Sequence, residues 1–108
     1  RLSLIHCGLS QITVDLPKLQ LLDLSQNSFS ALSQISTTSP ITNLIFKANH
    51  LEKIDFNYQL RNLKALDLSQ NKIKFLTGVK CYQIKSLELK GNPIYSLMPL
   101  KNMDLSSL

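Results

Sequence analysis

The side chains best suited to chemistry are two histidines and two cysteines, and their spacing argues against a reaction centre. His6 and His50 lie far apart, and no Cys-x-x-Cys or His-x-x-x-His segment brings metal ligands together. A serine nucleophile needs a histidine within hydrogen-bond reach. The glycines Gly8, Gly78 and Gly91 are isolated, so they form no phosphate-binding loop. We therefore expect no catalysis, no metal site and no cofactor.

The composition indicates one folded domain. The chain has 108 residues, of which 44% are hydrophobic and 18% charged, as in ordinary globular proteins. It contains no apolar run of the roughly 18 residues that a membrane span requires. The net charge is +5, but the lysines are scattered. Scattered lysines favour a solvated basic surface over a dedicated site for a polyanion.

A sequence repeat must position all of these side chains. Residues 22–27 and 66–71 are the same hexapeptide, Leu-Asp-Leu-Ser-Gln-Asn, and residues 2–7, 44–49 and 87–92 follow its pattern. Each unit reads L-x-L-x-x-N/C-x-L-x-x-L, where L is any apolar residue. The landmark positions are separated by 20, 22, 22 and 21 residues, and they are Cys7, Asn27, Asn49, Asn71 and Asn92.

This pattern resembles the leucine-rich repeat family over residues 1–108. The resemblance implies an α/β solenoid, a horseshoe with short parallel strands on its concave face and little helix. It also implies one domain of about five repeats plus the start of a sixth, as a fragment of a longer array. By spacing, Leu105 and Leu108 correspond to Ile84 and Leu87. About a dozen residues remain for each return, so we expect extended or 3₁₀ connections.

The landmark residues have a structural explanation. A side-chain amide both donates and accepts hydrogen bonds, so the asparagines can stack as a ladder that joins the turns of adjacent repeats. Cys7 occupies the same position, which predicts a buried thiol. It lies roughly 15–20 Å from Cys81, too far for a disulfide. Upstream, Leu16, Leu60 and Cys81 form a further apolar column, and the Ser/Thr-rich residues 33–40 predict a looser connection.

Function in a solenoid is expected on the outward side chains of the strands, which are free of core packing. These candidate partner-binding residues form two columns: Ser3, Asp23, Ile45, Asp67 and Glu88, and beside them Ile5, Ser25, Lys47, Ser69 and Lys90. They predict a protein partner. Nucleic acid is not expected, because the face lacks clustered cations and interleaved aromatic rings. Alternatively, Asp23 and Asp67 serve sheet packing and solubility, since Leu-Asp-Leu-Ser is repeat consensus.

The Leu-Asp-Leu-Ser-Gln-Asn segments and the opening Cys7-Gly-Leu-Ser are similar to extracellular repeats of Toll-like receptors and of insect leucine-rich immune proteins. That similarity implies an extracellular location, as a secreted immune protein or receptor ectodomain. An intracellular location is the alternative, because the 22-residue step is closer to internalins and phosphatase regulators, and no Asn-x-Ser/Thr sequon occurs.

Two other functions remain open from the sequence. One is a structural spacer or self-association element, joined through exposed leucines at the repeat ends. The other is a weak binder of anionic ligands. Lys64 and Lys85 occupy equivalent positions just before their strands, and Lys53, Lys72 and Lys74 follow the Asn turns on the opposite flank. Steep salt dependence would be the mark of that function.

Overall fold

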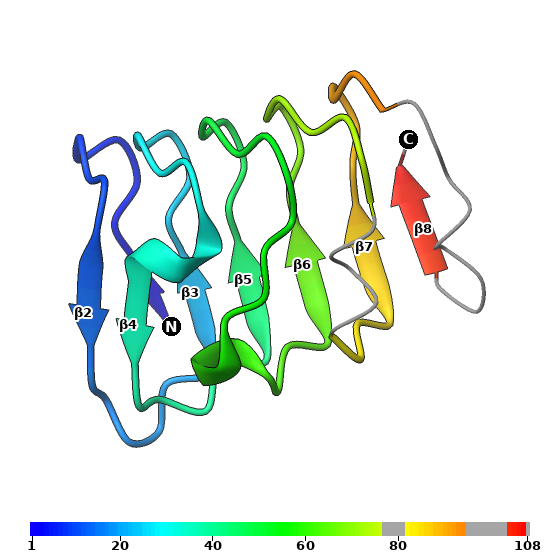
Figure 1. Cartoon of the computed structure of the whole chain (residues 1–108). Helices are drawn as coiled ribbons and strands as arrows, with labels where there is room; N and C mark the ends of the chain where they lie inside the picture. Colours follow the sequence, from blue (N-terminus) through cyan, green and yellow to red (C-terminus); the bar gives the residue numbers. More distant parts are fainter. Residues whose placement is uncertain (77–81, 95–103, 108) are drawn as a thin grey trace.

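Short parallel strands, one from each repeat, stack into a single sheet (Figure 1). The computed structural model describes residues 1–76, 82–94 and 104–107. The strands lie in the order β1 (Leu2–Ser3), β3 (Leu21–Asp23), β5 (Asn43–Ile45), β6 (Ala65–Asp67), β7 (Ser86–Glu88) and β8 (Asp104–Ser107). The chain is therefore a parallel-strand β-solenoid with almost no helix, and the prediction of a solenoid with short parallel strands is confirmed.

The repeat places its leucines in line along the sheet. Leu22, Leu44, Leu66 and Leu87 pair with one another in neighbouring strands, and all four are buried. Alternation along a strand sends these side chains to the inner face and their neighbours to the outer face. In the first five repeats each strand of this sheet ends after two or three residues, because the chain then turns inward towards the landmark position.

The strand of the sixth unit is present, but its predicted register is wrong. β8 pairs with β7, and Leu105 lies opposite Leu87 rather than opposite Ile84. The prediction assumed that the last step keeps the length of the others. Here the pairing residue arrives 18 positions after Leu87, compared with 21 between Leu66 and Leu87. Leu108 lies outside the described residues.

A second, two-stranded sheet lies across the back of the first repeats. It pairs β2 (Ile12–Val14) with β4 (Ile35–Thr37) in parallel. The Thr37 hydroxyl donates to the Val14 carbonyl, and Thr38 donates from its backbone N and its hydroxyl to the Asp15 carboxylate. The expectation of a looser connection over residues 33–40 is therefore wrong. Ser and Thr hydroxyls that bond to backbone groups hold this segment in place.

Side chains of the next repeat cover the other edge of β4. The Asn57 amide donates to the Ile35 carbonyl at 2.7 Å, and the Gln59 amide oxygen accepts from the Thr37 N–H at 2.9 Å. Two 3₁₀ turns complete the return segments, η1 (Leu32–Gln34) and η2 (Tyr58–Leu60). They confirm the expectation of extended and 3₁₀ connections.

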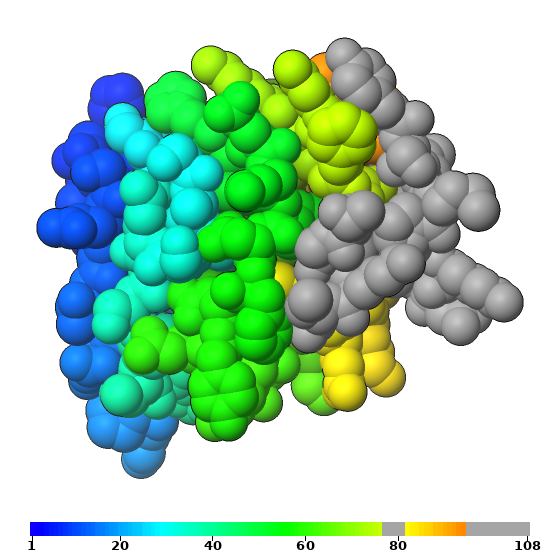
Figure 2. Space-filling view, viewed as in Figure 1, coloured from blue at the N-terminus to red at the C-terminus, as the bar shows by residue number. Residues whose placement is uncertain are grey.

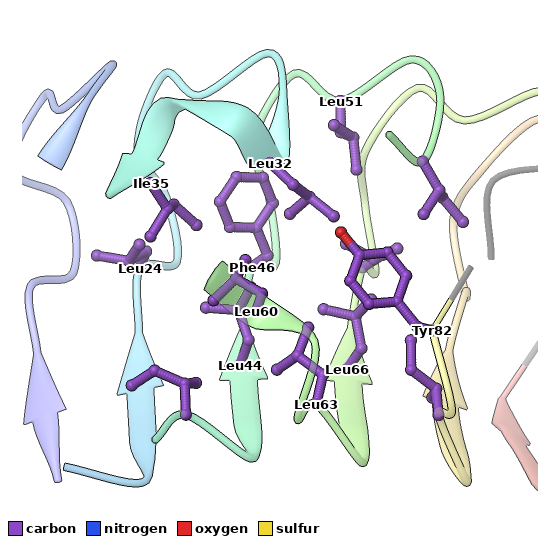
Figure 3. Packing of buried hydrophobic residues seen from close by; sticks show 14 of the residues in the cluster. Leu24, Leu32, Ile35, Leu44, Phe46, Leu51, Leu60, Leu63, Leu66 and Tyr82 are labelled. Atoms are coloured by element: carbon purple, nitrogen blue, oxygen red, sulfur yellow. The ribbon is translucent and has the colours of Figure 1, made fainter. Parts of the chain in front are cut away.

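The core fills the space between the six-stranded sheet and the return segments (Figure 3). Within it, the rings of Phe29 and Phe46 pack together, with their centroids 5.3 Å apart. Leu60 is buried as expected, whereas Leu16 is 47% exposed, contrary to the predicted column. Leu16 lies in a turn after β2. The Leu19 N–H donates to the Leu16 carbonyl and closes this turn, which directs the Leu16 side chain away from the core.

Stacking dominates the shape of the molecule. In the space-filling view the repeats appear as adjacent bands that follow one another from the N-terminus onwards (Figure 2). Each repeat therefore contacts chiefly the repeats before and after it, as in other solenoids. A surface that crosses several bands must be assembled from residues about 22 positions apart.

Candidate functional site

The landmark asparagines form the predicted ladder. Asn71 shows the arrangement: its amide donates to the carbonyls of Phe46 and Leu68, both at 3.0 Å, and its oxygen accepts from the Leu51 N–H at 3.0 Å. Equivalent bonds join the repeats at Asn27, Asn49 and Asn92. These amides satisfy backbone groups that would otherwise be buried without a partner. The asparagines are structural, and binding residues must be sought elsewhere.

The residue before each landmark adopts left-handed backbone geometry. Gly91 has φ +82°, and φ lies between 57° and 59° at His6, Gln26, Ala48 and Gln70. Left-handed geometry is unfavourable for residues with a Cβ. A Cβ at Gly91 would also approach Gln70 Cγ to 3.3 Å. The sequence predicted a turn after each strand but not its left-handed backbone, which the glycine at position 91 could have indicated.

Cys7 departs from the prediction of a buried thiol. Its side chain is exposed, and its thiol donates to the Ile5 carbonyl at 3.4 Å. Cys7 follows β1, which stands at one end of the strand order of the sheet. The Asn27 oxygen instead accepts from the backbone N–H groups of Cys7 and Leu9, both at 3.0 Å. Cys81, the other cysteine, lies outside the described residues.

The outward side chains of the six-stranded sheet form a surface that we call the sheet face. Strand pairing aligns the central column in the predicted order: Ser3, Asp23, Ile45, Asp67 and Glu88. The residues of the second column lie two positions further along the same repeats. The backbone carbonyl of each one from the second repeat onwards accepts from a backbone N–H of the preceding repeat, at Ser25, Lys47, Ser69 and Lys90. The structure therefore brings the predicted residues together in two adjacent columns.

Asp23 and Ser25 are not free for a partner. Asp23 is only 5% exposed, and its Oδ1 accepts from the Ser25 N–H at 3.0 Å and from the Ser25 hydroxyl at 2.7 Å. Arg1 completes the environment through a contact of 3.4 Å to Oδ2. The expectation that these positions are free of packing is wrong here. The carboxylate closes the turn by accepting from backbone and hydroxyl, in agreement with the structural alternative for Asp23.

The matching pair in the fourth repeat is more open. The Asp67 carboxylate accepts from the Ser69 N–H at 3.0 Å, and Ser69 is buried, which again contradicts the expectation. Asp67 itself is half-buried and lies directly opposite Glu88 on the next strand. Two carboxylates in adjacent, paired positions repel each other. Within the described residues, neither has an ion-pair partner.

A shallow hollow lies in the middle of the sheet face. It has a volume of about 100 Å³ and crosses β3, β5, β6 and β7. Its outward side chains come from the central column, at Ile45, Asp67 and Glu88, and from the column before it. The residues of that preceding column were not predicted as site residues, although the repeat spacing aligns them in the same way. They are Leu21, Asn43, Ala65 and Ser86. Lys47 and Lys90 are exposed in the column on the other side.

The other predicted site residues lie away from this hollow. Ser3 and Ile5 belong to the first repeat and are exposed, with Ile5 44% accessible. The sheet face thus divides into a first part that is closed by Arg1, Asp23 and Ser25, and a middle part around Ile45 that carries the hollow and the acidic pair. The middle part has the concave form that binding sites for side chains usually have.

Neither a metal centre nor a membrane span is seen in the parts of the chain that the structure describes. Over residues 1–76, 82–94 and 104–107, no three His, Cys, Asp or Glu side chains gather closely enough to hold a metal ion. No described helix has both the length and the apolar character needed to cross a membrane. The fold and surface define a class, a parallel β-solenoid with an outward sheet face. The sequence matches no protein-family model, no curated protein and no solved structure.

Proposed function

We propose that this protein is a leucine-rich repeat protein of horseshoe form, and that it recognises a protein partner through the middle of its sheet face. The observation that carries the proposal is the hollow around Ile45, which is lined from four neighbouring strands. Ile45 is half-buried and points away from the core, so its apolar surface has no packing role inside the repeat. An apolar residue at the centre of a polar surface is typical of a binding site.

The chemistry of the hollow favours a basic side chain from the partner. Leu21, Ile45 and Ala65 offer apolar surface to an aliphatic stem. Asp67 and Glu88 offer two carboxylates to the cation at its end. Lysine and arginine combine such a stem with such a charge. A partner cation between the two carboxylates would also relieve their mutual repulsion.

The partner is engaged by side chains and not by strand pairing. Along the face the backbone is already bonded from repeat to repeat, as in the bonds from the Leu24 N–H to the Ile45 carbonyl and from the Phe46 N–H to the Asp67 carbonyl. A bound segment therefore finds few free backbone groups within the sheet. Specificity then rests on the outward columns, which differ from repeat to repeat.

The proposal includes a binding role without catalysis and an extracellular location, as a secreted protein or receptor ectodomain in immunity. These follow from the family resemblance and from the lack of a nucleophile–histidine pair in the sequence. Both remain open to direct test, the location by fractionating the source cells and their culture fluid.

The decisive experiment is capture of a partner from the source tissue or its culture fluid. The bait is the chain in its native form, compared with a variant that carries Ile45→Lys and Glu88→Lys. We expect the variant to lose one specific protein, because the apolar centre gains a charge and the acidic pair becomes neutral overall. Circular dichroism and the thermal midpoint establish that the variant is folded.

A matched control carries Leu16→Lys and Glu52→Lys. Both residues are exposed and lie off the sheet face, and the charge changes are the same. The control should capture the partner as well as the native chain does. Equal capture by all three proteins would contradict the proposal. Concentration-dependent dimerisation of the native chain that Leu2→Asp abolishes would instead favour the self-association alternative.

A further inference from the structure

A polar groove follows the edge of the solenoid where strands β6 and β7 begin, the lower edge in Figure 1. One hollow of about 170 Å³ is lined by Arg61, Asn62, Leu63, Lys64, Gln83 and Lys85. A second hollow, of about 460 Å³, shares Arg61 and Asn62 with the first and continues past Tyr58 and Gln59 towards Thr38. The two hollows thus form one groove across three repeats.

Three cations come together in this groove through the repeat itself. Lys64 and Lys85 precede β6 and β7 by one residue, so strand pairing places them side by side at about the 4.8 Å spacing of neighbouring strands. Arg61 ends η2 and reaches the same hollow from the back. Three of the twelve Lys and Arg residues therefore line this one groove.

Two contacts with Tyr58 orient the Arg61 side chain. Its guanidinium lies 4.3 Å from the centre of the Tyr58 ring, and Nη1 donates to the Tyr58 carbonyl at 3.1 Å. A planar guanidinium that is oriented in this way keeps further N–H groups for an oxyanion. Orienting the side chain in advance lowers the entropy cost of binding.

No carboxylate neutralises these cations. Among the described residues, the one ion pair within 4.0 Å is that of Arg1 with Asp23, on the sheet face. Of the described residues that line the two hollows, none is acidic. Beside Thr38 lies Asp15, whose carboxylate already accepts from the N–H and the hydroxyl of Thr38. Three like charges in one groove repel each other, so an anionic ligand would relieve that repulsion.

The neutral lining indicates which kind of anion fits. The backbone along this edge is already paired, because the N–H groups of Lys64 and Ala65 bond to the Thr42 carbonyl, and those of Lys85 and Ser86 bond to the Lys64 carbonyl. A peptide therefore finds no strand edge to extend. The amides of Asn62 and Gln83 stand beside the cations, and amides bond well to hydroxyl groups because they both donate and accept.

We propose that this groove binds a sulfated polysaccharide. Arg61, Lys64 and Lys85 would bind its sulfate groups, and Asn62 and Gln83 would bind its hydroxyls. The site lies off the sheet face and does not depend on the protein partner proposed above. Of the lysines that the sequence analysis named for an anionic ligand, the site includes Lys64 and Lys85. It also includes Arg61, which the sequence analysis did not connect with them.

The test measures binding of a short heparin oligosaccharide to the whole chain by titration calorimetry at low and physiological salt. The variant Lys64→Gln/Lys85→Gln spares Arg61, which supports η2. We expect its affinity to fall on the order of tenfold, because charge-assisted bonds to sulfate are lost. Adding Arg61→Gln should weaken binding further, and Lys85→Arg alone should retain it.

The matched control is Lys72→Gln/Lys74→Gln, which removes the same charge from exposed lysines that follow the Asn turns. It should bind heparin nearly as well as the native chain. An equal loss in both double variants would overturn the proposal, since it would show an effect of net charge alone. Desulfated heparin should not bind. Equally tight binding of a polyglutamate peptide or a single-stranded oligonucleotide, with the same residue dependence, would also overturn the assignment to a polysaccharide.

Discussion

Residues 22–27 and residues 66–71 have the same sequence in two different settings. Their turns are alike: Gln26 and Gln70 both have φ 57°, and each aspartate accepts from the N–H two residues later at 3.0 Å. Their surroundings differ. Asp23 is buried and contacts Arg1, whereas Asp67 is half-buried and lies opposite Glu88. The hexapeptide thus determines the turn, and the neighbouring repeats determine which surface that turn presents.

The largest difference between the copies is expected at their asparagines. Asn71→Ala should lower the free energy of unfolding by about 3 kcal/mol, because buried groups such as the Leu51 N–H and the Phe46 carbonyl lose their hydrogen-bond partner. Asn27→Ala should cost about half as much, since the Cys7 N–H and the Leu4 carbonyl lie near solvent and can bond to water. Urea denaturation followed by circular dichroism measures both.

The control for this pair is Asn43→Ala, which removes an exposed amide that bonds only to the neighbouring Thr42 hydroxyl. It should change stability by less than about 0.5 kcal/mol. Equal losses at Asn27 and Asn71 would contradict the idea that neighbouring repeats set the energy of each turn.

The aspartates should differ next. Asp23→Asn should destabilise the fold by roughly 1–2 kcal/mol, because the carboxylate loses charge-assisted bonds to Ser25 in a buried site. Asp67→Asn should be nearly neutral, since the loss of the bond from Ser69 is offset by relief of repulsion from Glu88. Thermal melts of the two variants at one pH compare them directly, and a larger loss for Asp67→Asn would reverse the comparison.

The glutamines should behave alike, which tests the common part of the motif. Gln26→Gly and Gln70→Gly each relieve roughly 1–2 kcal/mol of strain from the left-handed backbone conformation. Glycine also raises the conformational entropy of the unfolded chain, and this offsets part of the gain in stability. Each variant should therefore gain about 0.5 kcal/mol of stability. Opposite signs at the two sites would show that the turns are less alike than their backbone angles suggest.

The smallest effect concerns Arg1. Its side chain is 60% exposed, so solvent and salt screen its contact with Asp23. Arg1→Gln should change stability by less than about 0.5 kcal/mol at physiological salt. A comparison of melting temperatures at low and high salt isolates this contribution, and a large loss that salt does not alter would mean that Arg1 stabilises the first repeat by packing.

Much of the six-stranded sheet could be predicted from the sequence, because the repeat spacing determines which residues lie side by side in neighbouring strands. Identical spacing forces Leu22, Leu44 and Leu66 into one column, and an amide that bonds both ways explains the asparagine ladder. The central column of candidate site residues follows from the same register. Its burial does not, because Asp23 contacts Arg1 of the preceding repeat and is buried, whereas Asp67 in the same motif is half-buried.

The back of the solenoid could be predicted only in outline. About a dozen residues return there with no shared pattern, so local bonds decide the path. The Thr37 hydroxyl attaches β4 to β2, and the turn closed at Leu19 exposes Leu16. The register of β8 was missed for a related reason, since a change in step length leaves no mark in the sequence. The groove at Arg61 needed the path of η2 and was therefore invisible as well.

The side chains along β4 have a consequence for behaviour at high concentration. An exposed strand edge is a template on which a second chain can add a strand, and long assemblies grow from such edges. At β4 the Ile35 carbonyl and the Thr37 N–H are already occupied by Asn57 and Gln59 of the same chain. These two side-chain amides therefore block the addition of a further strand to this edge of β4. The short back sheet ends at two strands, and on this side it does not offer these two backbone groups to a second chain.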